Sequence, residues 1–305
     1  MNDTSQANNP LVSVVVTTYN RANVLEKCLD YILAQSYTNF ELIVVDDCSS
    51  DSTPSIFKKS KYSKVKYIRL EKNSGVQIAS NTGFDFASGA YLAFTGDDDY
   101  WICEDKLKKQ VAIFESDHDL KYGVVTCDVN IVNKNSRYKK NIQKPKNLVK
   151  HILNNNGFIY GSAALLRRDA FVRAGKFAPE LPKGTDSDVY RRIILMGYDI
   201  YLINDALIDY TNESDDKMTN LDLKGLDRSI VANRYKLNTY DSVLKKFPRV
   251  RSNIYYNMAN YYSLKNKQTK SATSLELAKI HYRLSFKFSY LNFKSLIKYL
   301  MLLLK

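Results

Sequence analysis

Short apolar runs alternate with amphipathic stretches along the first third of the chain, and this alternation predicts strands followed by helices. Residues 11–16 form a near-continuous apolar run rich in valine, which is typical of a strand buried on both faces. The next stretch predicts a helix, because its apolar residues recur at helical spacing. These residues are Val24, Leu25, Cys28, Leu29, Ile32 and Leu33. Further strands are predicted at 40–45, 65–70 and 91–94, with a helix before the last of them that ends near Gly89.

Strands that alternate with helices in this way predict a doubly wound, mostly parallel α/β sheet. In such sheets, ligands bind outside the carboxyl ends of the strands. Polar clusters follow three of the predicted strands, at 17–21, 46–47 and 97–99. We therefore expect these clusters to converge on one rim of the sheet.

Downstream of residue 101 the pattern is less regular but still mixes both kinds of element. The expected elements are a helix at 104–115, strands at 122–130 and 161–166, a turn region at 171–180 and a helix within 183–198. The stretch 137–150 is basic and contains Asn, so we expect a mobile loop there.

The composition changes from about Asp227 onward, where strand-like runs end and Lys, Tyr, Leu and Asn dominate. Helices are expected around 229–247, 252–265, 271–286 and 293–304. The predicted organisation is a polar tail at 1–10 without a secretion signal, an α/β domain at 11–226 with halves at 11–101 and 102–226, and a helical extension at 227–305.

The last segment of this extension mixes basic and aromatic residues. Residues 282–288 and 293–299 carry Arg, Lys, Phe and Tyr at close spacing, a composition typical of a helix that lies in a membrane interface. A helix that packs on its neighbours and points its lysines to water has the same composition, so both interpretations stay open.

The net charge of +13 indicates an acidic partner: nucleic acid, an anionic membrane or a phosphorylated substrate. No apolar run approaches the roughly 20 residues that a membrane-spanning helix needs. The cysteines show neither metal-site nor disulfide spacing and fit reduced thiols in a cytosolic protein. They are Cys28, Cys48, Cys103 and Cys127.

Three adjacent carboxylates, Asp97, Asp98 and Asp99, follow the strand predicted at 91–94 and precede Trp101 by a few residues. Neighbouring like charges repel, and a divalent cation with oxygen ligands is the usual compensation. We therefore predict a site where a metal ion and a diphosphate bind together. The alternative is a solvated acidic loop with Trp101 packed beneath it.

The glycine-rich phosphate loops of dinucleotide-binding proteins and P-loop proteins are missing from this sequence. A nucleotide would therefore be held by side chains, with Tyr19 on a face of the base and Asp47 on base or ribose edges.

Several ordered motifs in the N-terminal two thirds resemble those of the family 2 glycosyltransferases, inverting enzymes of the GT-A fold. The matching stretches are VVVTTYN at 14–20, QSYTNFELIVVDDCS at 35–49, NSG at 73–75, NTG at 81–83, ASG at 87–89, DDYW at 98–101, DKL at 105–107, GKF at 175–177 and DSDVYRRIILMGY at 186–198. The helical tail loosely resembles those of bacterial members that make surface polysaccharides.

The resemblance implies a role for each matching residue. These roles are nucleotide binding for Thr17, Tyr19, Asn20, Asp47 and Asp98, binding of Mg²⁺ or Mn²⁺ for Asp99, catalysis as general base for Asp186, and support for Asp97, Trp101 and Asp188. Without the resemblance, Asp186 and Asp188 would be interpreted as acidic residues that stabilise the N-terminus of a helix through its dipole.

Four features depart from the family pattern. Ser80 stands where Arg is frequent, Gly96 occupies the first acidic position of the metal motif, and Thr185 replaces an acidic residue before the base. The segment 102–104 is one residue longer than usual and lacks its proline.

The function implied is inverting transfer of a hexosyl or N-acetylhexosaminyl group from a nucleotide sugar, expected to be a UDP-sugar, to a saccharide or lipid-linked saccharide. The expected setting is synthesis of O-antigen, capsule or another surface polysaccharide, in the cytoplasm and peripherally on the inner face of the cytoplasmic membrane. One alternative is a sugar-phosphate nucleotidyltransferase, although residues 17–20 do not form its basic glycine-rich loop. A nucleic-acid-binding protein is the second alternative, but no binding signature interleaves the basic residues.

Overall fold

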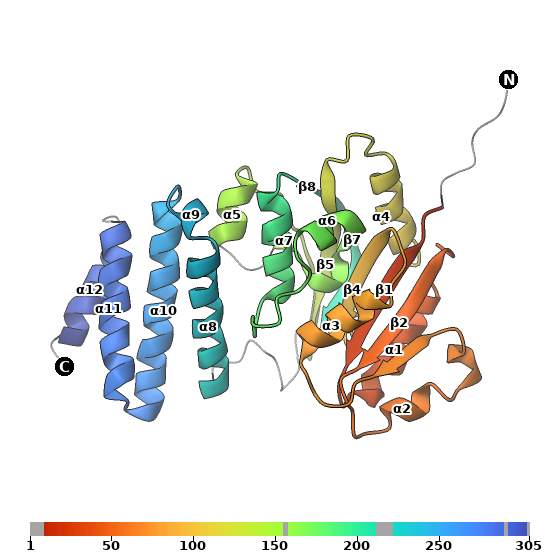
Figure 1. Cartoon of the computed structure of the whole chain (residues 1–305), viewed down its shortest axis with the longest axis horizontal. Coiled ribbons are helices and arrows are strands. Elements are labelled where there is room, and N and C mark those ends of the chain that lie inside the picture. Colours follow the sequence, from red (N-terminus) through yellow and green to blue (C-terminus); the bar gives the residue numbers. More distant parts are fainter. Residues whose placement is uncertain (1–8, 155–157, 212–221, 290–291, 304–305) are drawn as a thin grey trace. The chain divides into compact units, whose positions relative to one another are not determined.

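The computed structural model of the chain describes residues 9–154, 158–211, 222–289 and 292–303 (Figure 1). Its backbone contacts divide the chain into two compact units. We call them the α/β unit, formed by 1–144, 157–179 and 186–214, and the helical unit, formed by 145–156, 180–185 and 215–305. The expected boundary after residue 226 stays a prediction.

In the described part of the chain, eight strands form one mixed sheet in the α/β unit. The strands are β1 (Val12–Thr18), β2 (Phe40–Asp46), β3 (Lys66–Arg69), β4 (Tyr91–Gly96), β5 (Tyr122–Asn133), β6 (Ser136–Lys140), β7 (Leu165–Arg167) and β8 (Asp199–Thr211). Their order is β3-β2-β1-β4-β7-β5-β6, with β8 paired to β5. The first four strands are parallel, β7 is antiparallel to both neighbours, and β8 is parallel to β5. The predicted doubly wound, mostly parallel sheet is confirmed.

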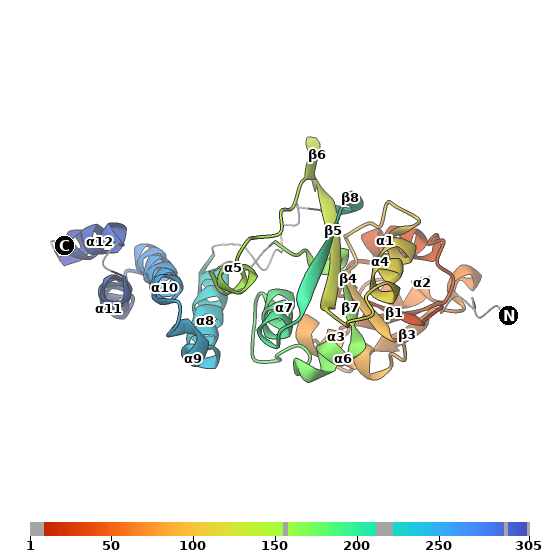
Figure 2. The same ribbon diagram turned by 90° about the horizontal axis from the view of Figure 1, so that it is seen from above.

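Helices cover both faces of the parallel strands, as Figure 2 shows for α1 (Ala22–Leu33) and α4 (Lys106–Glu115) on one side and α3 (Val76–Asp85) on the other. Successive residues of a strand point to opposite faces. Val14 and Val16 therefore pack in the cluster that includes α1 and α4, whereas Val15 packs against Ala79 of α3. This double burial explains why β1 is a continuous apolar run.

The α/β unit contains further helical elements. They are α2 (Thr53–Ile56), η1 (Ser60–Tyr62), η2 (Gly161–Ala163), α6 (Arg168–Arg173) and α7 (Thr185–Leu195). The strand predicted at 161–166 is wrong at its start, where the 3₁₀ turn η2 precedes the short β7. The turn region predicted from residue 171 begins inside α6.

The mobile loop predicted at 137–150 is wrong. Residues 136–140 form β6, a fully exposed strand that pairs antiparallel with β5, and Leu148–Asn154 forms α5. β6 forms despite its polar composition because it pairs with β5. α5 forms because Ile152 and Leu153 give it a buried side.

The helical unit contains α5 and the helices of the predicted extension. These are α8 (Leu223–Thr239), α9 (Asp241–Leu244), α10 (Pro248–Thr269), α11 (Ala272–Phe288) and α12 (Phe293–Leu303). Their ends follow local chemistry, because Asp222 and Ser271 cap the first turns of α8 and α11, and Pro248 opens α10. None of the helices in the described ranges is both long and apolar enough to cross a membrane.

Candidate active site

The carboxyl ends of β1, β2 and β4 meet at one edge of the sheet. Thr18 lies opposite Asp46 in the β1–β2 register, and Thr17 lies opposite Gly96 in the β1–β4 register. The polar residues that follow these strands therefore converge on one rim, as the sequence predicts. This rim is the frame on which the candidate site is built.

Asp97 and Asp98 both pair with the guanidinium group of Arg21 at this rim. Asp97 is buried and accepts a hydrogen bond of 2.6 Å from Thr18 Oγ1. Arg21 places Nε 3.4 Å from Asp97 Oδ1 and donates from a terminal nitrogen to Asp98 Oδ2 at 2.8 Å. Burial raises the pKa of Asp97 to about 6 even though Arg21 opposes the shift.

Asp99 is buried, as Asp97 is. Its Oδ2 accepts a hydrogen bond from the Ser162 hydroxyl of η2, and its Oδ1 accepts one of 3.3 Å from the backbone N–H of Thr211 in β8. Burial and the charge of Asp98 raise the pKa of Asp99 to about 7. The cluster thus has more negative charge than Arg21 alone neutralises, a condition that favours a bound cation.

Asp186 lies in the first turn of α7, against η2. Its Oδ1 accepts a hydrogen bond of 2.7 Å from the N–H of Ser187, and burial raises its pKa. A Cβ atom built on Gly161 would lie 3.1 Å from Asp186 Oδ2, so only the smallest side chain leaves this carboxylate in place. Because Ser162 holds Asp99, two adjacent residues of η2 contact carboxylates that are 87 positions apart in sequence.

Asp188 has different surroundings from Asp186. It is fully buried and pairs with Arg191 at 3.0 Å and Arg192 at 2.9 Å. Arg192 in turn donates to the carbonyl of Lys176 at 2.8 Å. Asp188 therefore ties α7 to the turn that follows α6, and its expected supporting role is to hold the helix that carries Asp186.

The residues expected to bind a nucleotide lie at the ends of β1 and β2. Tyr19 is 44% exposed, and Thr17 is half-buried. Asp47 is buried and accepts hydrogen bonds of 2.7 and 2.8 Å from the N–H groups of Ser74 and Gly75. The carboxylate of Asp47 thus fixes the turn before α3, where Gly75 has a φ of 91°.

Asn20 and Trp101 serve the framework of the site. Asn20 has a left-handed backbone with a φ of 54°, and its Oδ1 accepts a hydrogen bond of 2.7 Å from the N–H of Ser50. Trp101 is buried in the core, with Lys106 Nζ 3.8 Å from its ring centroid. Trp101 therefore belongs to the hydrophobic core of the unit.

Sequence reasoning missed Ser162, Gly161 and Tyr210. The Tyr210 ring packs 4.7 Å from that of Tyr160, and burial together with the charges of nearby carboxylates, Asp99 first among them, raises its pKa. Tyr210 belongs to β8, which was not predicted because Asp and Asn interrupt its apolar pattern. The short apolar run from Ile200 to Ile203 was the available signal.

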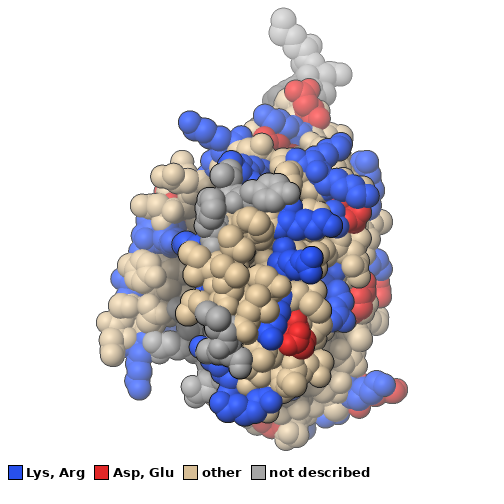
Figure 3. All heavy atoms as spheres, turned by 90° about the vertical axis from the view of Figure 1, so that its left-hand side faces the viewer, with Lys and Arg blue, Asp and Glu red and all other residues tan. Residues whose placement is uncertain are grey.

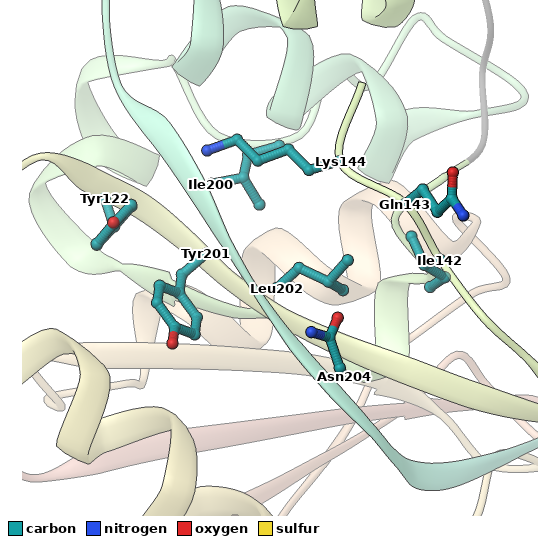
Figure 4. A pocket seen from close by; sticks show the side chains of 8 residues that line it. All are labelled: Tyr122, Ile142, Gln143, Lys144, Ile200, Tyr201, Leu202 and Asn204. Carbon is teal, nitrogen blue, oxygen red and sulfur yellow. The ribbon is translucent and has the colours of Figure 1, made fainter. Parts of the chain in front are cut away.

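A hollow of about 600 Å³ lies away from these carboxylates. Figure 4 shows its lining, which includes Tyr201, Leu202 and Asn204 of β8 and Lys144. Tyr201 precedes Thr211 by ten residues, which along a strand is roughly 30 Å. The hollow is therefore not part of the candidate site.

Comparison with known protein families identifies the family of this chain. The model of the glycosyl transferase family 2 matches residues 13–174, which is more than half of the chain. The chain belongs to this family. It is a glycosyltransferase, and the resemblance seen in its motifs is confirmed.

Two curated relatives illustrate the range of the family. The UDP-Glc:alpha-D-GlcNAc-diphosphoundecaprenol beta-1,3-glucosyltransferase WfgD of Escherichia coli is 32% identical over 148 residues, which cover 48% of this chain and 56% of WfgD. The amylovoran biosynthesis glycosyltransferase AmsB of Erwinia amylovora is 28% identical over 209 residues, which cover 65% of this chain and 68% of AmsB. The chain thus matches little more than half the length of WfgD.

Solved structures confirm the GT-A fold. S. aureus TarS 1-349 in complex with UDP-GlcNAc superposes with a TM-score of 0.61, covering 95% of this chain and 90% of that chain at 19% identity. The mannosyltransferase PcManGT from Pyrobaculum calidifontis, in complex with GDP-Man and Mn²⁺, superposes with a TM-score of 0.60, covering 95% and 87% at 19% identity. Identities this low support the fold alone.

Proposed function

We propose that this glycosyltransferase moves a sugar from a UDP-sugar to an acceptor hydroxyl with inversion at the anomeric carbon. The observation that carries the proposal is that Asp186 and Asp99 lie against two adjacent residues of η2, Gly161 and Ser162. One carboxylate is then available to the acceptor and the other to the donor diphosphate. A direct displacement needs both at once and needs no carboxylate nucleophile.

Asp186 is proposed as the general base. A base must lie within hydrogen-bond reach of the acceptor hydroxyl, and a pKa closer to neutrality makes it a better proton acceptor. Burial moves the pKa of Asp186 in that direction. Gly161 beside it has no Cβ, which would otherwise lie 3.1 Å from Asp186 Oδ2. Tyr210, close to both Asp186 and Asp99, would shape the space between them.

Asp99 is proposed as the carboxylate that holds Mg²⁺ or Mn²⁺. Within the described residues, no three side chains of His, Cys, Asp or Glu gather into a metal site by themselves, so a bound ion would also need oxygens of the donor diphosphate. The residues fit such an ion, because Asp97 and Asp99 offer hard oxygen ligands and a cation would favour the charged forms that burial and the charge of Asp98 disfavour. Bound there, the ion would neutralise the leaving diphosphate. PcManGT was solved with Mn²⁺.

The donor is proposed to be a UDP-sugar held by Tyr19, Asp47 and Asp98. TarS was solved with UDP-GlcNAc, and WfgD is named for its use of UDP-Glc. Tyr19 is exposed enough to stack on a base, and Asp47 lies at the adjacent strand end. Asp47 already accepts two backbone hydrogen bonds, so its remaining lone pairs would have to accept the hydrogen bonds that the base donates.

The acceptor is proposed to be a saccharide linked to a lipid diphosphate, used in the synthesis of a bacterial surface polysaccharide. The support comes from the names of the relatives, since WfgD acts on a diphosphoundecaprenol-linked GlcNAc and AmsB belongs to amylovoran biosynthesis. The net charge of +13 suits an acceptor that carries phosphate. A lipid-linked acceptor of this kind would be met at the cytoplasmic side of the inner membrane.

A panel of nucleotides and nucleotide sugars tests this proposal. UDP with Mn²⁺ should raise the melting temperature more than GDP or ADP, since a ligand at 100 times its Kd stabilises the fold by about 2.7 kcal/mol. Slow release of UDP from one UDP-sugar should stop in excess EDTA. Equal stabilisation by the three nucleotides would contradict the donor assignment. Release of pyrophosphate from UTP and a sugar phosphate would instead support a nucleotidyltransferase.

A further inference from the structure

Helix α12 turns a polar side toward its neighbours. Ser295 is fully buried, and its hydroxyl lies 2.8 Å from that of Ser285 on α11. The Ser285 hydroxyl lies 3.1 Å from that of Ser252 on α10, and Asn292 donates to both Ser252 and Ser285. A ladder of hydroxyl groups therefore holds α12 on the helical unit.

Lys298 also reaches inward from α12. Its ammonium donates to Asn260 Oδ1 at 2.7 Å and lies 5.0 Å from the ring centroid of Tyr256 and 5.8 Å from that of Tyr282. The position of α12 on α10 and α11 is thus fixed by specific polar contacts as well as by half-buried apolar ones.

The outer side of α12 carries large apolar side chains. The most exposed are Ile297 at 57%, Leu300 at 49%, Met301 at 59% and Leu303 at 51%. Residues at positions i, i+3 and i+4 share one side of a helix, so Ile297, Leu300 and Met301 form a continuous apolar strip. A helix stabilised mainly by burial would turn this strip inward. Because the strip points outward, we infer that a binding partner covers it.

The charge around the strip shows what kind of surface would cover it. Residues 277–305 contain six Lys and Arg residues and no Asp or Glu. Arg283, Lys287 and Lys294 are exposed on α11 and α12, as is the apolar Ile280. Viewed from the α12 side in Figure 3, mainly Lys and Arg side chains, with some acidic atoms, border an uncharged area.

We propose that the strip on α12 with its basic border docks on the surface of an anionic lipid bilayer. A helix of 11 residues is about 16 Å long, half the roughly 30 Å of a hydrocarbon core, so α12 would lie along the interface. The apolar side chains would enter the acyl region while the cations contact lipid phosphates. The proposal does not depend on the donor or acceptor of the transfer reaction.

A second copy of the chain is the rival occupant. A symmetric dimer places the same patch on both sides of its interface. The basic borders of two such patches would face each other and repel, whereas anionic lipid supplies the opposite charge. Charge therefore favours the bilayer over self-association.

Sedimentation of the full-length protein with vesicles tests the proposal. The wild type should bind vesicles of phosphatidylglycerol and phosphatidylcholine, and bind much less to phosphatidylcholine alone. The triple variant Ile297→Gln, Leu300→Gln, Met301→Gln should weaken binding at least about 100-fold, since burying each such side chain is worth roughly a factor of 10. A second triple variant, Arg283→Gln, Lys287→Gln, Lys294→Gln, should lose on the order of 100-fold on the anionic vesicles, about fivefold per charge.

A matched control replaces exposed apolar residues elsewhere. The variant Leu120→Gln, Val172→Gln, Val231→Gln changes side chains that are 57%, 47% and 43% exposed and should bind like the wild type. UDP release from donor without lipid should be unchanged in all three variants, which separates this proposal from the transfer function. Unchanged vesicle binding by the α12 variant overturns the proposal. So does a wild-type dimer that the α12 variant converts to a monomer without vesicles.

Discussion

Asp186 and Asp188 lie two residues apart in the first turn of α7, yet one faces Gly161 and the other is enclosed by Arg191 and Arg192. Residues two apart on a helix point roughly 200° apart, so the two carboxylates cannot serve the same site. One position is shaped for chemistry at the rim and the other for holding the helix. This difference predicts opposite responses to the same substitution.

Replacing each aspartate by Asn should separate activity from stability. Burial raises the folded-state pKa of Asp186, so the stability that its protonated form contributes is lost as the pH rises through that pKa. At neutral pH the melting temperature of Asp186→Asn should therefore be no lower than that of the wild type. Any increase over the wild type should become smaller as the pH falls towards about 4. Asp188→Asn removes the buried charge that pairs with Arg191 and Arg192 and should cost about 3–5 kcal/mol. Melting curves of both variants over this pH range check the prediction, and a lower melting temperature for Asp186→Asn contradicts it.

Gly161→Ala should damage turnover without weakening nucleotide binding. The added Cβ would lie 3.1 Å from Asp186 Oδ2, so the carboxylate must move by a few tenths of an ångström. Small misplacements of a catalytic group can cost up to about 100-fold in rate. Steady-state kinetics and titration with UDP measure the two effects. Wild-type turnover would mean that Asp186 tolerates displacement and is not the base.

Ser162→Ala should weaken the metal site through Asp99. Losing the hydroxyl that orients a ligating carboxylate typically costs about 10–100-fold in metal affinity. The concentration of Mn²⁺ that gives half-maximal activity should rise by that factor. Ser13→Ala is the matched control, because Ser13 is also buried and bonded to a carboxylate, that of Glu41, at the far end of β1. An equal effect of both substitutions would indicate a general loss of packing instead.

Tyr19→Ala should weaken UDP binding while leaving the fold intact. Stacking of a base on an aromatic ring is worth about 1–3 kcal/mol, or roughly 5–150-fold in Kd. Tyr19 is 44% exposed, so its removal opens no large cavity. Calorimetric titration with UDP measures the loss, and Tyr138→Ala, at an exposed tyrosine of β6, serves as the control. Unchanged UDP affinity would remove Tyr19 from the donor site.

The sequence predicts the nucleotide half of the molecule well because its strands are buried on both faces and followed by polar clusters. β1, β2 and β4 lie within a few residues of the predicted strands, and the rim that joins Thr17, Asp47 and Asp99 follows from parallel pairing alone. The four cysteines, predicted to be reduced, are free. Gly96 stands where the family pattern has an acidic residue, and the neighbouring Asp97 contacts Thr18 and Arg21. A sequence motif does not reveal these contacts.

The second half of the site could not be predicted in the same way. Ser162 belongs to a 3₁₀ turn and Tyr210 to a strand interrupted by polar residues, so neither has a clear periodic signal. Their positions depend on pairing between β5 and β8, which starts 77 residues apart in sequence, at Tyr122 and Asp199. Contacts that join such distant segments are set by tertiary packing, which local patterns do not encode.

The most direct test of the account is the turnover of Asp186→Asn measured beside its affinity for UDP. Asn keeps the shape and hydrogen bonding of the side chain but removes its basicity. Turnover of the transferred sugar should fall about 10²–10⁴-fold, the usual size of a general-base contribution, while UDP and Mn²⁺ bind as in the wild type. Retention of most of the activity by Asp186→Asn would contradict the assignment of this site as the centre of sugar transfer.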